Sequence, residues 1–294
     1  EQKAFSELGR LIKLKEQKPD VIVGFAGCLA QHLRGEIFKR ANKVDLVLGT
    51  HNIHRLPEML EALRKEGRKQ IQVDFLPEIH SLKIFTPPSR GSTSAFVSIM
   101  QGCDNFCAYC VVPFLRGPEM SRKPEDILEE VKRLTDHGVK EVILLGQNVN
   151  SYGKKQEFAC DFVSLIEKIN EVDGIERIRF TTSHPKDLSE DLISCFARIP
   201  KLCEHIHLPV QSGSNRILKL MNRCYSKEDY LEKVMKLRNA CPSISITSDI
   251  IVGFPGESEE DYQETIDMME KIRFDSIFSF KYSERKGTAA QALT

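Results

Sequence analysis

The sequence predicts an α/β protein in two parts: a small N-terminal α/β domain with a parallel sheet, followed by a six-unit (β/α)6 partial TIM barrel. Short β-branched runs alternate with segments of helical periodicity along almost the whole chain. A polar segment that carries Pro87-Pro88 interrupts this alternation. We therefore expect domains at residues 1–80 and 95–294, joined by a linker at 81–94.

The N-terminal domain is expected to begin with an amphipathic helix and to continue as alternating strands and helices. A glycine, Gly67, follows the last of these helices, where it fits a left-handed C-cap. Alternation of this kind predicts parallel strands, because each crossover returns the chain to the same edge of the sheet. Helices are expected at 1–18, 31–41 and 53–66, and strands at 21–27 and 45–49.

The second domain repeats a strand–helix unit six times, fewer than the eight units of a closed barrel. An incomplete barrel is expected, with its site at the C-terminal ends of the strands; an open doubly wound sheet is the alternative. Strands are expected at 95–100, 140–145, 176–181, 204–208, 244–252 and 276–281. Helices are expected at 124–136, 160–171, 188–198, 214–222, 227–239 and 258–271.

The composition excludes some classes of protein. The chain has 294 residues with 42 basic and 42 acidic side chains, so no global field attracts nucleic acid or an anionic membrane. No apolar run long enough for a membrane span and no secretory leader is visible. Nine cysteines in such a chain indicate a cytoplasmic protein with a metal or redox role. Because the chain begins with Glu1 inside a predicted helix, we expect it to be a fragment or a processed form.

Three of these cysteines stand directly after the first strand of the predicted barrel. Cys103, Cys107 and Cys110 have the spacing C-x3-C-x2-C. Three thiolates leave one iron of a cubane 4Fe-4S cluster without a protein ligand, whereas closed ferredoxin sites use four cysteines. A zinc site is the first alternative, but the next His or Cys, His137, falls in a predicted helix. Unreactive buried thiols are the second.

Further motifs follow later strands: Gly146-Gln147-Asn148, Gln211 with Arg223, and Ile251 with Gly253. Together with the cysteines they resemble the radical S-adenosylmethionine (SAM) superfamily. This resemblance implies that SAM chelates the open iron and that an electron from the cluster splits it into methionine and a 5′-deoxyadenosyl radical. Each of these signals is weak when considered alone: the alternative for Arg223 is an ordinary surface arginine, and the alternative for Gly253 is a simple turn at a strand end. The resemblance assigns cofactor contacts to Tyr109, Gly146, Gln147, Asn148, Gln211, Arg223, Ile251 and Gly253.

Longer sequence motifs of the chain resemble the methylthiotransferase family within that superfamily, such as LLGQNVNSYG, TTSHP and DIIVGFPGES. Members carry an auxiliary 4Fe-4S cluster, and Cys28 falls where its third cysteine ligand belongs. The resemblance implies that the other two ligands precede Glu1 and that an RNA-binding TRAM domain follows about residue 294. Without these parts we expect no activity. From its surroundings alone, Cys28 is either a helix N-terminal thiol suited to ligation or a buried strand-end cysteine.

The resemblance also implies a reaction. A methylthio group would be added to carbon 2 of N(6)-isopentenyladenosine at position 37, in the anticodon loop of tRNA. Partners would be the tRNA and a low-potential electron donor such as a flavodoxin or a ferredoxin. Alternatives are a methylthiotransferase for threonylcarbamoyladenosine or for a ribosomal protein. From a different class, the alternative is a non-catalytic iron–sulfur or zinc protein that binds RNA.

Three basic residues of the loop after the cysteines, Arg116, Arg122 and Lys123, are candidate contacts to RNA phosphates. A solvated charged loop is the alternative. His184, at a strand end, would either contact the substrate or hold the turn before Pro185. The remaining cysteines are read as structural thiols: Cys160, Cys195, Cys203, Cys224 and Cys241.

Overall fold

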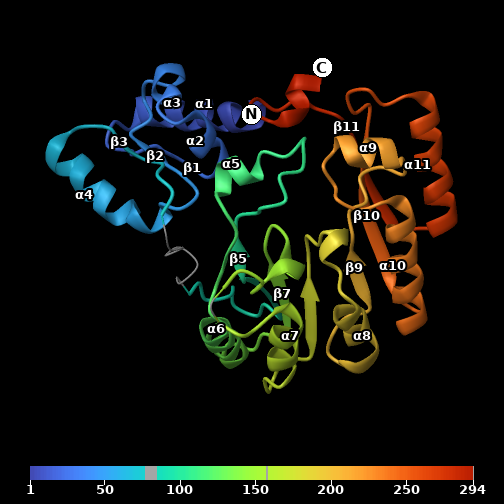
Figure 1. Ribbon diagram of the computed structural model, residues 1–294. Coiled ribbons are helices and arrows are strands. Elements are labelled where there is room, and N and C mark those ends of the chain that lie inside the picture. Colours follow the sequence, from blue (N-terminus) through green and yellow to red (C-terminus); the bar gives the residue numbers. More distant parts are fainter. Residues whose placement is uncertain (77–84, 157, 294) are drawn as a thin grey trace. The chain divides into compact units, whose positions relative to one another are not determined.

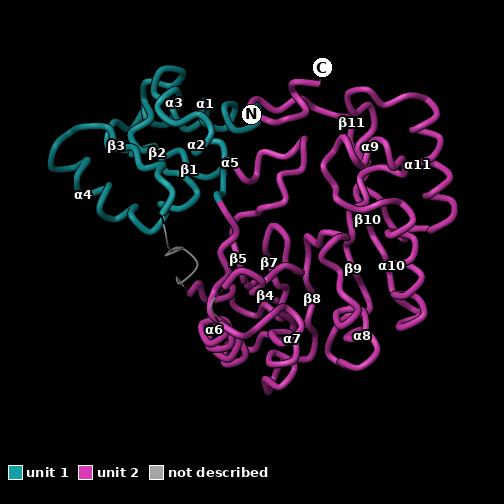
Figure 2. The backbone as a smooth tube through the Cα atoms, viewed as in Figure 1, with its two compact units in different colours: residues 1–84, 114–117 teal, residues 85–113, 118–294 magenta. Residues whose placement is uncertain are grey.

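The computed structural model describes residues 1–76, 85–156 and 158–293, which form two compact units (Figure 2). Unit 1 contains residues 1–84 and 114–117, and unit 2 contains residues 85–113 and 118–294. The short stretch 114–117, which follows the three cysteines in the sequence, therefore packs with unit 1. Part of the predicted linker lies outside the described residues.

Unit 1 contains a three-stranded sheet in the order β1 (Gly24–Ala26), β2 (Leu46–Leu48) and β3 (Gln70–Gln72). All pairs are parallel, as the sequence predicts. The third strand is not predicted, because its sequence Gln-Ile-Gln lacks the apolar run that marks a buried strand. Apolar side chains from the strands and helices pack in two clusters; Ile37 and Val47 are fully buried in the larger one, and Leu46, Leu48 and Met59 form the smaller one.

The helices of unit 1 follow the prediction with one exception. The helix expected at 31–41 is wrong, because Arg34 adopts a left-handed backbone (φ 49°) and separates two short helices. Gly67 has φ 65° and ends α4 as a left-handed C-cap, which confirms that expectation. The helices are α1 (Gln2–Gln17), α2 (Cys28–Leu33), α3 (Glu36–Arg40), a 3-10 turn at Ile53–Arg55 and α4 (Leu56–Glu66).

In unit 2 the six predicted strands follow one another in chain order, and their paired neighbours are parallel (Figure 1). A bridge between Ile178 and Leu202 connects the two three-stranded halves. A doubly wound sheet reverses its strand order at a switch point, and this sheet does not, so the partial barrel is confirmed. The strands are β4 (Ser94–Ser98), β7 (Glu141–Leu145), β8 (Arg177–Phe180), β9 (His205–His207), β10 (Ser245–Val252) and β11 (Ser276–Lys281).

The helices of unit 2 cover the sheet and bury a large core, whose fully buried side chains include Val131, Leu144 and Ile246. Figure 1 shows α10 and α11 alongside β10 and β11. The predicted helices appear as α6 (Pro124–Asp136), α7 (Phe162–Asn170), α8 (Glu190–Arg198), α9 (Asn215–Leu220), α10 (Lys227–Ala240) and α11 (Glu259–Ile272). Short 3-10 turns lie at Val149–Ser151, Pro185–Asp187 and Ala289–Leu293. Across the described parts of the chain, no helix combines the length and apolar character needed to cross a membrane.

A small antiparallel pair interrupts the regular alternation after β4. It joins β5 (Met100–Gln101) to β6 (Met120–Ser121). The segment between these two strands is the loop that carries the cysteines, followed by a short helix, α5 (Val112–Arg116). The pair therefore closes the base of that loop.

Candidate metal centre and cofactor pocket

The loop with Cys103, Cys107 and Cys110 lies beyond the C-terminal end of β4, at the expected end of the barrel. Cys103 and Cys107 are 8% and 9% exposed, and Cys110 is half-buried. Distant segments hold the loop in place. The Ala108 N–H donates to the Met221 carbonyl (2.9 Å), and the Ala108 carbonyl accepts from the Ala290 N–H (2.8 Å). The loop is therefore shaped by tertiary contacts.

A second contact acts on the same loop. The Asn222 side-chain amide donates to the carbonyl oxygens of Asn105 (3.3 Å) and Phe106 (3.0 Å). Phe106 has φ 46°, a left-handed backbone that is unfavourable for a bulky residue. The asparagine contacts stabilise this conformation between Cys103 and Cys107.

Burial works against charge on these thiols. It raises the pKa of Cys103 to about 11, with the neighbouring Cys107 and Cys110 adding to the rise. Burial also raises the pKa of Cys110. Thiolates at Cys103 and Cys110 are therefore unfavourable by themselves, and cationic iron bound there would offset both the desolvation cost and the repulsion. The donor set fits a metal group.

Each of the three sulfurs also accepts from an N–H group. The backbone N–H of Asn105 donates to Cys103, and that of Val112 donates to Cys110 at 3.5 Å. The Arg223 guanidinium donates to Cys107 at 3.4 Å. Such donors surround the sulfurs of iron–sulfur clusters and tune them. In the described parts of the chain, no three His, Cys, Asp or Glu side chains are arranged to surround one metal ion. A cubane cluster does not need that arrangement, because each thiolate binds a different iron.

The Gly-Gln-Asn turn after β7 contacts the cysteine loop directly. The Gln147 Oε1 accepts from the Gly102 N–H at 2.7 Å. A Cβ on Gly146 would lie 2.4 Å from Cγ of Met100, so this glycine makes room for a methionine side chain. Asn148 is buried and donates to Asp187, while its Oδ1 has no partner among the described residues. That oxygen is a buried acceptor available to a ligand.

A pocket of about 550 Å³ opens at the ends of β10 and β11. It brings together three of the predicted cofactor residues, Tyr109, Gln211 and Ile251. Gln211 has φ 74°; its backbone N–H donates to Asp249, and its carbonyl accepts from Ile251. The pocket also contains residues that the sequence did not single out: Asp249, Ser279, Phe280, Lys281, Tyr282, Ser283 and Arg285. Phe280 lines the pocket because it pairs with Ile251 across β10 and β11. That pairing is known only once the strand register is known.

The other predicted cofactor residues lie outside the lining of this pocket. The buried Arg223 guanidinium donates to the Pro209 carbonyl (2.7 Å) and the Tyr225 hydroxyl (3.0 Å), and it contacts both Tyr109 and Cys107 at 3.4 Å. It is not a surface arginine. Gly253 has φ 70°, and its N–H donates to the Glu257 carboxylate.

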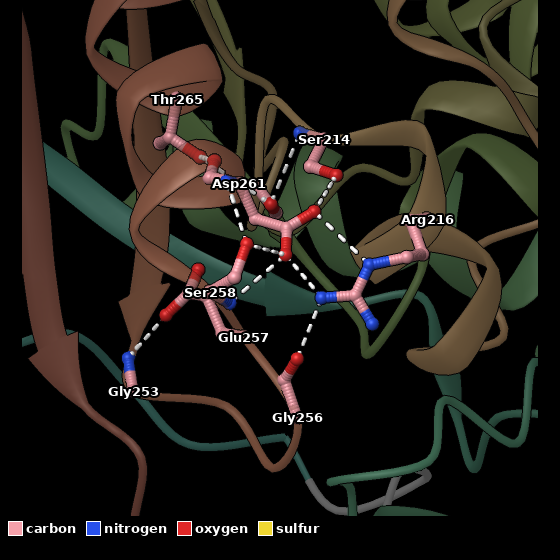
Figure 3. Close-up of polar contacts among 9 residues, drawn as sticks. Ser214, Arg216, Gly253, Gly256, Glu257, Ser258, Asp261 and Thr265 are labelled. Carbon is pink, nitrogen blue, oxygen red and sulfur yellow. Dashed lines mark hydrogen bonds and ion pairs between the residues drawn. The ribbon is translucent and has the colours of Figure 1, made fainter.

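A polar network connects the loops after β9 and β10 (Figure 3). The Asp261 carboxylate, 5% exposed, accepts from the Ser214 hydroxyl (2.5 Å) and from the Ser258 N–H and hydroxyl (both 2.9 Å). It also forms an ion pair with Arg216, whose guanidinium donates to the Gly256 carbonyl. The hydrogen bond with Arg216 is the largest cause that lowers the pKa of Asp261.

The structure buries the side chains of two of the four candidate RNA contacts. The Arg122 side chain is 8% exposed, pairs with Glu130 and donates to the Ser98 carbonyl, so it is not available to a phosphate. His184 is 5% exposed and lies against Cys107, so it presents no surface to RNA. Lys123 is exposed, and Arg116 is half-exposed in unit 1.

His184 instead serves the turn that it precedes. Its Nδ1 accepts from the Lys186 N–H at 3.2 Å, which caps the 3-10 turn at Pro185–Asp187. Burial, followed by the positive charge of Arg223, lowers the pKa of His184 to about 2. The ring is therefore neutral at physiological pH.

The remaining cysteines are free thiols. Cys28 is the first residue of α2 and half-buried, and it is the only cysteine of unit 1. Cys160, Cys195 and Cys241 are buried and Cys203 is half-buried, as structural thiols would be. Cys224 is exposed and so is not part of the core.

Comparison with protein families and relatives places this geometry in context. Residues 97–269 match the model of the Radical SAM superfamily. The chain is 57% identical over 289 residues to "tRNA-2-methylthio-N(6)-dimethylallyladenosine synthase" of Syntrophus aciditrophicus (strain SB), covering 98% of this chain and 63% of that protein. The protein of the same name from Syntrophotalea carbinolica is 48% identical over 296 residues, covering 100% of this chain and 67% of that protein. The chain thus spans less than two thirds of the first relative's length.

Solved structures show similarity of fold. A cobalamin-dependent SAM radical enzyme, OxsB, with aqua-cobalamin and SAM bound has a TM-score of 0.68 at 14% identity, covering 99% of this chain and 44% of that one. The radical SAM methyltransferase TsrM from Kitasatospora setae, with cobalamin and a 4Fe-4S cluster bound, has a TM-score of 0.57 at 15% identity. It covers 76% of this chain and 42% of that chain.

Proposed function

This chain belongs to the radical SAM superfamily and, within it, to the family of the tRNA-2-methylthio-N(6)-dimethylallyladenosine synthases, and from that premise we propose that the intact protein is a radical tRNA methylthiotransferase. The observation that carries the proposal is the cysteine loop. Three thiols gather at the C-terminal end of a partial barrel, and each sulfur accepts from an N–H group, that of Cys107 from the Arg223 guanidinium.

In this proposal Cys103, Cys107 and Cys110 hold the 4Fe-4S cluster that binds SAM. The pocket formed with Tyr109, Gln211 and Ile251 takes the adenosine of SAM, because it is large enough and joins apolar and polar groups. When bound, the cluster and SAM supply a one-electron route to removing hydrogen from a carbon that has no useful acidity.

The Gly146, Gln147 and Asn148 turn, Arg223 and Gly253 complete the proposed cofactor site. The unpartnered Asn148 Oδ1 suits an ammonium donor such as the amino group of SAM. Arg223 suits a carboxylate, since its guanidinium lies beside Cys107 and can bond in a fork.

The proposed substrate is N(6)-isopentenyladenosine at position 37 of tRNA, methylthiolated at carbon 2. An anticodon loop suits such an enzyme, because its unpaired bases can be splayed out without melting a helix. Lys123 and Arg116 remain proposed phosphate contacts, and Cys28 a proposed ligand of a second 4Fe-4S cluster. A low-potential donor such as flavodoxin or ferredoxin would supply the electron, and the cytoplasm is the proposed location.

The test of the radical chemistry is anaerobic reconstitution with iron and sulfide, reduction with dithionite and addition of SAM. We expect 5′-deoxyadenosine to form, and Cys107→Ala to abolish it. Cys195→Ala is the matched control, because this thiol is buried in α8 rather than in the loop. A chain that holds a cluster but releases no 5′-deoxyadenosine would refute the proposal and favour the non-catalytic RNA-binding alternative.

The substrate assignment needs its own experiment with the full-length protein. Mass spectrometry of tRNA after incubation with SAM should detect 2-methylthio adenosine only when the isopentenyl group is present. Equal modification of tRNA that lacks this group would contradict the assignment.

A further inference from the structure

Cys107 differs from its two partners in where its hydrogen-bond donors originate. Cys103 and Cys110 accept from backbone N–H groups two residues away in the sequence. Cys107 has two side-chain neighbours from distant segments instead. His184 Nε2 lies 4.0 Å and Arg223 Nη1 lies 3.4 Å from its sulfur. The environment of this sulfur is thus set by the tertiary fold.

The hydrogen-bond pattern of His184 settles which nitrogen carries the proton. Its Nδ1 accepts from the Lys186 N–H at 3.2 Å, so that nitrogen presents a lone pair. A neutral imidazole then carries its hydrogen on Nε2, the nitrogen that faces Cys107. The Nε2–H is therefore a donor directed at the sulfur, and the distance reflects the larger radius of sulfur compared with oxygen.

The position of the ring is held from three further directions. Asn150 binds the backbone of His184 on both sides: its Oδ1 accepts from the His184 N–H and its Nδ2 donates to the His184 carbonyl, each at 3.0 Å. The ring also packs edge-on against Tyr225, with centroids 5.8 Å apart. A side chain so constrained is preorganised rather than incidental.

We propose that His184 is a positioning residue that donates its Nε2–H to the Cys107 thiolate and thereby raises the reduction potential of the cluster. The proposal rests on the proposed function, since it needs a cluster on these cysteines. A donor withdraws electron density from the ligand sulfur and so stabilises the more negative, reduced cluster. His184 then favours acceptance of the electron that starts each turnover.

Two substitutions separate the sulfur contact from the turn contact. His184→Asn keeps an acceptor near the position of Nδ1 for the Lys186 N–H but cannot reach Cys107. His184→Gln places an amide N–H near the position of Nε2 and retains a donor to the sulfur. Both variants are made in a Cys28→Ala background, so that only one cluster is observed.

The readout is the midpoint potential of the reconstituted cluster without SAM, from an anaerobic redox titration followed by electron paramagnetic resonance. In His184→Asn we expect reduction to become about tenfold less favourable, which for a one-electron couple is about 59 mV more negative. His184→Gln should stay close to the unaltered chain. An unchanged potential in His184→Asn at equal iron content overturns the proposal, as does an equal shift in both variants.

A measurement on the unaltered chain tests the proposal even if both variants fail to fold. With histidine labelled by ¹⁵N, pulsed paramagnetic resonance of the reduced cluster should detect a nitrogen coupling. Absence of that coupling also overturns the proposal. A chain that binds no cluster at all refutes the proposed function itself, so the two failures are distinguishable.

Discussion

At the scale of single residues, polar side chains from the turn after β7 and from the segment after α9 hold the cysteine loop. Gln147 and Asn222 bind backbone groups of that loop, and Asn150 binds the backbone of His184. Such contacts place a metal-binding loop within the tolerance that its chemistry needs. The motif residues therefore contribute through the backbone they hold as well as through any ligand they touch.

Gln147 allows a direct test of this role. In Gln147→Ala the Gly102 N–H loses its 2.7 Å acceptor, so we expect a loss of about 1–2 kcal/mol in unfolding free energy and faster iron release to a chelator. Urea unfolding and iron release measure the two effects. Gln263→Ala is the control, because that exposed side chain bonds Asp267, one turn away in α11. Equal iron release in both variants would contradict the role.

At the scale of elements, the N-terminus of α11 connects the loops that follow two strands. Asp261 completes a capping box with Ser258 and also binds Ser214 and Arg216 (Figure 3). In α10 an equivalent capping box of Ser226 and Asp229 is exposed, and no arginine in the described parts of the chain pairs with it. The two boxes share a local pattern and differ in tertiary setting.

Asp261→Asn should cost about 2 kcal/mol at neutral pH, because the buried Ser214 hydroxyl and the Ser258 cap lose their charged acceptor, whereas the half-exposed Arg216 remains solvated. Asp229→Asn, at the same helix position, should cost about 1 kcal/mol or less. Thermal and urea unfolding compare the two. Equal losses would show that only the cap matters.

The same carboxylate makes stability depend on pH. Since the folded state lowers the pKa of Asp261, its contribution is complete above the ordinary aspartate pKa of about 3.9 and declines as the pH falls below that value. The difference in unfolding free energy between the unaltered chain and Asp261→Asn should therefore shrink from pH 5 to about pH 3. A constant difference over this range would contradict the lowered pKa.

At the scale of the whole molecule, the two units have separate cores. Ile37 and Val47 belong to the core of unit 1, and Val131 and Leu144 belong to that of unit 2. The chain crosses between them more than once, since residues 114–117 pack with unit 1. There the His51 ring bonds the Arg116 carbonyl at 2.9 Å, and the Thr50 hydroxyl donates to the Leu115 carbonyl at 2.7 Å.

Separate cores predict separable unfolding. Ile37→Ala leaves a cavity in unit 1 and should lower the stability of that unit by about 2–5 kcal/mol. Val131→Ala is the counterpart in unit 2. Differential scanning calorimetry should show that each substitution shifts a different transition. One common transition, shifted by both, would show that the units unfold together.

The sequence predicted unit 2 more accurately than unit 1 because its signals are local and strong. The strand at 244–252 and the helix at 258–271 differ from β10 and α11 by about one residue, since an apolar alternation and a serine cap mark them. In unit 1 the predicted helix at 31–41 was wrong, and β3 was not predicted. Neither the left-handed Arg34 nor a polar strand leaves a periodic signal.

The same difference applies to the candidate site. Each of its motifs is a short stretch of sequence, so spacing and resemblance were enough to predict it. The partners were not visible. From the sequence alone, Arg122 is a basic loop residue and His184 an ordinary turn residue. Only the structure shows that Glu130 pairs with Arg122 and that Cys107, distant in the sequence, lies beside the His184 ring.

The sequence by itself thus determined the partial barrel, the three-cysteine loop and the family, because periodicity and motif spacing are properties of neighbouring residues. Only the tertiary structure decided which side chains are buried, which nitrogen of His184 faces a sulfur, and which residues line the pocket. The physical reason is that hydrogen bonding and desolvation depend on groups brought together across the strand order, and no local pattern records those neighbours.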